Sequence, residues 1–226
     1  MNRYQRWLPV SGLLAVVALG LTGLISTPPP IAGAPAADVA QYYARHHVGL
    51  EAESLSNGLA MIFLVVFAAT FHARIRTIPS LVALVATAIV AACMLIEVAA
   101  FQALAYRPNP DPARAALLND FQSFAFQVTT FPALLFLVAA AVAILSSATL
   151  PNWLGLAAVA AAVLQAVSWV SFFAPPGPLA AGAYPDILAF GALLGWLVAC
   201  SVTMLRRRGG DSPSRYSEAR PRLRSQ

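Results

Sequence analysis

The chain has 226 residues, of which 59% are hydrophobic and only 10% are charged, and its mean hydropathy is +0.72. Soluble domains carry about 25% charged residues, so this composition excludes an ordinary soluble protein and predicts an integral membrane protein. The net charge of +5 comes from the arginine-rich end of the chain, and it indicates a cytoplasmic membrane face rather than a nucleic-acid partner.

Six apolar runs have lengths that suit a bilayer crossing, which takes roughly 20 residues. They cover residues 7–26, 55–71, 81–103, 121–145, 153–173 and 187–205. We therefore predict an all-α, polytopic membrane bundle of six transmembrane helices within residues 1–205. Residues 206–226 are polar and basic and are predicted to form a disordered cytoplasmic tail.

The distribution of arginine predicts the orientation in the membrane. Eleven of the fourteen basic residues fall on one side of the predicted crossings: Arg3, Arg6, Arg74, Arg76 and the seven tail arginines from Arg206 to Arg224. The positive-inside rule places that side in the cytoplasm. We expect a multi-pass protein of the bacterial plasma membrane with both termini cytoplasmic, and we expect the tail to bind anionic lipids.

The first run also has features of a signal peptide, because a small-residue motif, Ala34-Pro35-Ala36, follows it. The apolar run is about 20 residues long, whereas the apolar part of a signal peptide has about 7 to 15. We expect it to be retained as a helix; cleavage, the alternative, would leave five crossings and an outer N-terminus.

The segment after Pro28 to Pro30 predicts a short helix outside the bilayer. Asp38 suits a helix cap, and apolar and aromatic residues from Val39 to His46 recur on one face. We expect this helix to lie at the outer interface and to end near Gly49, before the second crossing begins.

One ionisable side chain, Glu97, lies within the apolar stretch 81–100. A carboxylate at that depth costs a few kcal/mol or more, so such residues face the bundle interior and are candidates for functional sites. We expect Glu97 to face the interior, either protonated or hydrogen-bonded by carboxamides at neutral pH.

A polar stripe follows the fourth run, where Asp120, Ser123, Gln127 and Thr130 recur on one face of the predicted helix. Asp111 and a following proline predict that this helix begins outside the bilayer. Pro132 is expected to kink it, with threonine hydroxyls near the freed carbonyl.

Several of these side chains are predicted to lie at the same depth in the membrane. Counting the rise of about 1.5 Å per residue places Glu97, Gln127 and Gln165 at similar depths, and Ser168 shares a face with Gln165. The candidate intramembrane polar site therefore comprises Glu97, Gln127, Gln165, Ser123, Thr130 and Ser168. Either these residues hold the helices together by hydrogen bonds or they line a cavity.

Small residues recur along the sixth run at Gly191, Gly195 and Ala199, a spacing that permits close helix approach. We expect the ridge to pack within the chain; a homodimer seam is the alternative. Of the two cysteines, neither has metal-ligand spacing, and Gly49 separates His46 and His47 from Glu51 and Glu53. We therefore predict no metal and no cofactor.

Four segments carry a resemblance to known proteins: YYARHHVGLEAESLSNGLA before the second crossing, LPNWLGLAAVAAAVL in the fifth, the APPGPLA turn, and WLVACSVTMLRRR at the end of the sixth. In these the chain resembles the small, uncharacterised six-helix membrane proteins common in high-GC bacteria. The resemblance implies a fold and a membrane location and brings no catalytic residues.

Two functions remain open from the sequence. The first is a structural or accessory membrane protein that binds a partner, favoured because polar residues are few. The second is a small permease or sensor that uses Glu97 as a proton or cation site. An enzyme is not expected, since no nucleophile–base pair or phosphate-binding loop can be identified.

Overall fold

The computed structural model describes residues 7–25, 28–106, 111–174, 177–179 and 184–207, and these residues form helices and their connections without any strand. In chain order the elements are α1 (Val10–Ile25), α2 (Ala36–Ile75), α3 (Ile78–Ala105), α4 (Pro112–Val128), α5 (Thr130–Leu145), α6 (Asn152–Ser168), the 3₁₀ turn η2 (Trp169–Phe172) and α7 (Tyr184–Arg206). The all-α prediction is confirmed for this part of the chain. Of the predicted tail, 206–226, Arg206 ends α7 and Arg207 follows it, and the rest lies outside the described residues.

Five helical segments are long and apolar enough to cross a membrane: Ala36–Ile75, Ile78–Ala105, Pro112–Leu145, Asn152–Phe172 and Tyr184–Arg206. The first helix, α1, is apolar but has only 16 residues, or about 24 Å at the α-helical rise. The described residues thus support a multi-pass membrane bundle with five such segments. The sixth crossing and the orientation stay predictions.

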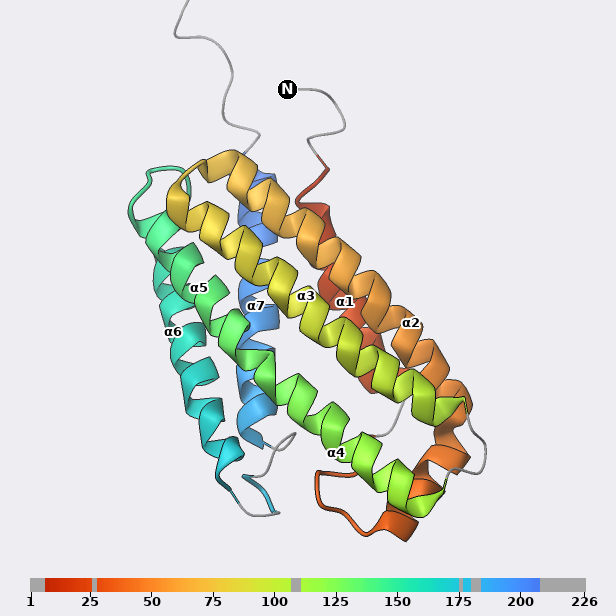
Figure 1. Cartoon of the computed structure of the whole chain (residues 1–226). Coiled ribbons are helices and arrows are strands. Elements are labelled where there is room, and N and C mark those ends of the chain that lie inside the picture. The colour runs from red at the N-terminus through yellow and green to blue at the C-terminus, as the bar shows by residue number, and fades with distance from the viewer. Residues whose placement is uncertain (1–6, 26–27, 107–110, 175–176, 180–183, 208–226) are drawn as a thin grey trace, which may run out of the picture.

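The helices run up and down the bundle, so that α1 begins and α7 ends at the same end (Figure 1). We call this the basic end, because Arg74, Arg76, Arg206 and Arg207 lie there. Arg74 Nη1 donates to the Met204 carbonyl at 2.8 Å, and Arg207 Nη1 donates to the Thr149 carbonyl at 2.9 Å. We call the opposite end, where α2, α4 and α7 begin, the acidic end.

The second helix corrects the prediction of a separate interfacial helix. α2 runs without a break for 40 residues and includes Gly49. A single glycine costs a helix only about 1 kcal/mol, and packing outweighs that cost here. Val39, Tyr43 and Leu50 are fully buried against residues of α3 and α4. This part of α2 therefore belongs to the bundle and does not lie on its surface.

The fourth run forms one long rod, as predicted, which changes direction between α4 and α5 at Thr129 (Figure 1). Asp111 caps it by accepting a hydrogen bond from the Arg114 N–H at 3.0 Å. Pro132 has no N–H for the Val128 carbonyl, one turn earlier, which explains the break. The Thr129 hydroxyl donates to the Ala125 carbonyl at 3.0 Å.

The two glycines of the small-residue ridge of α7 do not pack within the described chain, whereas Ala199 is partly buried against the core, so the prediction fails at Gly191 and Gly195. A Cβ built on Gly191 or Gly195 would have no atom within 4 Å. The physical reason is the rotation of α7, which turns Trp196, Leu197 and Cys200 toward the core and leaves the glycines outside.

Candidate functional site: a carboxylate-lined cavity at the acidic end

The inward face of α4 carries a run of buried polar side chains. Asn119, Gln122, Ser123 and Gln127 are all buried, and Thr130 continues the run into α5. Asp120, which the sequence pattern included, sits at the edge of this face and accepts a hydrogen bond from the Gly33 N–H at 2.9 Å. The buried face of α4 is therefore rotated slightly from the predicted stripe. It contains two carboxamides, Asn119 and Gln122, that the predicted stripe did not include.

Glu97 of α3 is 6% exposed and meets this face at Gln122. Gln122 Nε2 donates to Glu97 Oε1 at 3.1 Å. Neither Glu97 Oε2 nor Gln122 Oε1 has a hydrogen-bond partner among the described residues. An unpaired buried polar atom costs about 1 to 3 kcal/mol, a cost that a hydrogen-bond donor from a ligand would relieve.

The two carboxamides expected beside Glu97 have other surroundings. Gln165 Nε2 donates to the Ala189 carbonyl of α7 at 3.0 Å. Gln127 is fully buried, and its amide atoms have no hydrogen-bond partner within the described structure. Counting residues along each helix measures depth only, whereas partners also depend on helix tilt and rotation, and Gln122 is the carboxamide that α4 turns toward Glu97.

Of the remaining predicted residues, Thr130 joins two helical elements, whereas Ser168 and Ser123 bond within their own helices. Thr130 Oγ1 accepts from Trp169 Nε1 at 3.0 Å and donates to the Gln127 carbonyl at 2.7 Å. Ser168 is fully buried and donates to the Gln165 carbonyl at 2.8 Å. Ser123 donates to the Asn119 carbonyl at 2.9 Å.

Glu97 lines a partly open cavity of about 240 Å³ at the acidic end. Two further carboxylates, Glu53 of α2 and Asp186 of α7, line the same cavity with Gln122 and Ser123. The other lining residues are apolar: Pro28, Pro29, Pro30, Ile31, Phe101, Phe126, Ile187 and Phe190. No basic side chain is present among the described lining residues.

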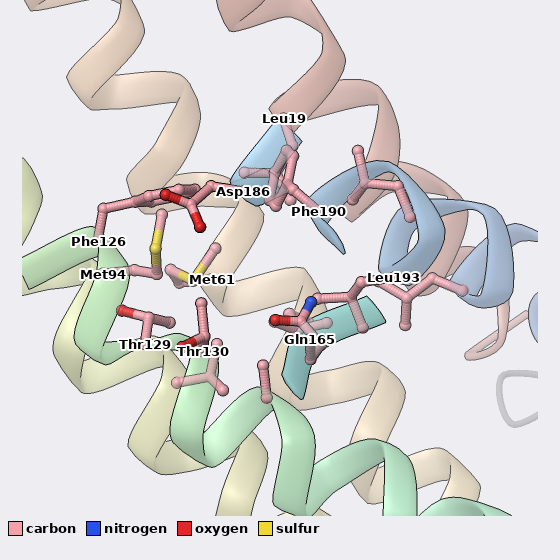
Figure 2. A pocket seen from close by; sticks show the side chains of 15 residues that line it. Leu19, Met61, Met94, Phe126, Thr129, Thr130, Gln165, Asp186, Phe190 and Leu193 are labelled. Atoms are coloured by element: carbon pink, nitrogen blue, oxygen red, sulfur yellow. The ribbon is translucent and has the colours of Figure 1, made fainter. Parts of the chain in front are cut away.

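A smaller, mainly apolar cavity of about 40 Å³ adjoins the first one, with Phe126, Asp186 and Phe190 lining both. Figure 2 shows its lining, with Asp186 and Phe126 on one side and Gln165 on the other. Asp186 is 1% exposed, and the Ser171 hydroxyl lies 3.5 Å from its Oδ1. Asp186 thus lies between the larger, acid-lined cavity and the smaller, mainly apolar cavity.

Three cavity residues were missed by sequence reasoning: Glu53, Gln122 and Asp186. Glu53 and Asp186 lie near predicted membrane boundaries, where acidic side chains are ordinarily solvated, and Asp186 also occupies the first turn of α7. Gln122 was detectable, because it lies three residues after Asn119 and one residue before Ser123, on the same inward face of the helix.

The acids around the cavity do not form a metal centre. Within the described ranges, no three His, Cys, Asp or Glu side chains are placed close enough together to hold a metal ion. Cys93 and Cys200 are free thiols, and Cys200 is buried.

Fold and site together define a multi-pass helical membrane protein with a carboxylate-lined cavity at one end. No protein-family model, no curated protein and no solved structure matches the chain.

Proposed function

We propose that this chain is a small membrane permease or sensor that holds a cation or a proton at Glu97. The observation that carries this proposal is the unpartnered Oε2 of a carboxylate that lines a cavity without basic side chains among its described walls. A carboxylate in an apolar span is costly unless something neutralises it. A bound cation or proton would do so, and the open acidic end provides a way in.

The proposal includes an orientation: six crossings in the plasma membrane of a bacterium, with the basic end in the cytoplasm. The arginines gathered at that end support it through the positive-inside rule. In a variant with Cys93 and Cys200 replaced by alanine, single cysteines at the exposed positions Ala113 and Ala148 report the two ends.

Intact cells are treated with a membrane-impermeant maleimide. We expect labelling of the Ala113→Cys variant and not of Ala148→Cys, because the first lies at the acidic end and the second at the basic end. Labelling of Ala148→Cys alone would reverse the orientation.

The binding claim is tested by thermal unfolding of the purified protein in detergent with Na⁺, K⁺ and ammonium salts at constant ionic strength. A ligand at one hundred times its Kd stabilises the folded state by about 2.7 kcal/mol. We expect at least one cation to stabilise the parent and not Glu97→Gln. The matched control is Glu51→Gln, which changes an exposed acid of the neighbouring helix α2 and should behave as the parent.

A structural or accessory role is the second candidate, and a different observation favours it. Several buried polar groups join helices directly, such as Tyr43 Oη to Asn119 Oδ1 at 3.0 Å and Gln165 to the Ala189 carbonyl. Bonds of this kind add about 0.6 kcal/mol each in membrane bundles. If Glu97→Gln leaves every cation response unchanged, this second role is the one to pursue, with a lipid, a protein partner or a second copy at the Gly191, Gly195 and Ala199 ridge.

A further inference from the structure

The walls of the larger cavity are chemically divided, and the division points to a class of ligand. One part is acidic and polar, formed by Glu53, Glu97, Asp186 and Gln122. The other part is aromatic, formed by Phe101, Phe126 and Phe190. The rings of Phe126 and Phe190 lie 6.0 Å apart in an edge-to-face arrangement.

The size of the cavity and the spacing of its acids argue against a bare metal ion. A volume of about 240 Å³ exceeds the space of one water, about 30 Å³, several times over. The described acids also do not converge as metal ligands do. A bare ion would not fill this space or reach acids on three helices, whereas a molecular cation can.

Aromatic faces attract organic cations, because the ring quadrupole is negative above the ring plane. Phe126 and Phe190 also line the smaller apolar cavity, together with Met61 and Met94. Methionine side chains adapt easily to the shape of a guest. An apolar group attached to the cation would therefore lie against the two rings.

We propose that the larger cavity binds a small organic ammonium ion that carries an apolar group. The ammonium donates to Glu97 Oε2 and Gln122 Oε1, the two buried oxygens without partners. Asp186 lines the same space, so its carboxylate lies beside the charged centre, and the apolar group lies against the rings of Phe126 and Phe190. This inference rests on the proposed function and names the ligand class of the same site.

The test measures equilibrium binding to the purified protein in detergent by titration calorimetry. Benzylammonium is the probe, benzyl alcohol is its neutral counterpart of similar shape, and Na⁺ and methylammonium are the cations without a large apolar group. We expect benzylammonium to bind more tightly than methylammonium, and benzyl alcohol to show no Glu97-dependent binding. Glu97→Gln should weaken benzylammonium binding by about thirtyfold or more, as truncation of a buried charge partner does.

The aromatic wall has a matched pair of variants on one helix. Phe126 lines both cavities, whereas Phe124, two residues away on α4, is 47% exposed and lines neither. Phe126→Leu should weaken benzylammonium binding by about twofold to thirtyfold, the range of a cation–π contact, and Phe124→Leu should not change it. If Phe126→Leu does not fold, Phe190→Leu on α7 tests the same aromatic wall and should weaken benzylammonium binding in the same way.

Three results would overturn the inference. If benzyl alcohol binds as tightly as benzylammonium, the positive charge does not contribute to binding. If the Phe124 and Phe126 variants have equal effects, the aromatic wall does not contact the ligand. Glu97-dependent binding of Na⁺ without binding of benzylammonium would refute the ligand class and leave the proposed function standing. Absence of Glu97-dependent binding for every cation would refute both.

Discussion

At the scale of single residues, Glu97 has one oxygen that is hydrogen-bonded and one that is not. Gln122 Nε2 occupies Oε1, while Oε2 lies buried without a partner among the described residues. A buried polar group left unpaired destabilises a fold by about 1 to 3 kcal/mol, and a bound donor would relieve that cost.

Two substitutions at Glu97 distinguish the loss of its charge from the loss of its hydrogen bond to Gln122. Glu97→Gln retains a carbonyl oxygen for Gln122, so we expect its thermal stability in detergent to match the parent. Glu97→Leu leaves Gln122 unpaired and should destabilise by about 1 to 3 kcal/mol. A Leu variant as stable as the parent would mean that the hydrogen bond to Gln122 contributes nothing, and the geometry of the site would have to be abandoned.

At the scale of helices, the packing of α1 depends on one glycine. A Cβ on Gly12 would meet Ser201 Oγ of α7 and would come within 2.6 Å of the Phe67 ring of α2. Overpacking of this kind costs about 1 to 3 kcal/mol, so Gly12→Ala should lower the unfolding temperature.

Gly195 provides the control for this prediction, because nothing lies within 4 Å of its position in the described chain. Gly195→Ala should be neutral or stabilising by up to about 1 kcal/mol, the gain in helix propensity. Equal effects at both positions would show that α1 does not sit against α2 and α7 as described.

The extension of α2 beyond the bilayer core gives another prediction. Tyr43 is fully buried, and its hydroxyl donates to Asn119 Oδ1 of α4. Tyr43→Phe leaves that oxygen without its donor and should destabilise by about 1 to 3 kcal/mol. Tyr106, which is 79% exposed, is the matched site, and Tyr106→Phe should be silent in the same unfolding assay.

Hydropathy predicted the long helices well, because apolar length and a capping residue such as Asp111 are local properties. It failed at residues 38–50, where the polar composition suggested a surface helix. Burial of Tyr43 and Leu50 against α3 and α4 is a long-range contact that no local pattern reveals. Long-range packing also limited prediction of the site. Glu97 was identified because it is the one ionisable residue in an apolar run, whereas identifying Gln122 as its partner requires the rotation of α4 about its axis.

At the scale of the whole molecule, three helices bring the acids of the cavity together. Glu53 comes from α2, Glu97 from α3 and Asp186 from α7, and α4 supplies Gln122 and the ring of Phe126. The basic end lies at the far end of the same bundle (Figure 1) and holds four of the six described arginines, whereas Arg45 and Arg114 lie toward the acidic end. A cation that enters at the acidic end would meet carboxylates first and apolar walls after them.

The central claim is that Glu97 is a carboxyl group that a cation can occupy. A membrane-soluble carbodiimide reacts with protonated carboxyl groups in apolar surroundings, and peptide mass spectrometry locates the product. We predict that Glu97 in the membrane-embedded protein is modified, and that benzylammonium or another bound cation slows the modification while benzyl alcohol does not. Modification at the same rate with every cation, or none at Glu97, would contradict the account.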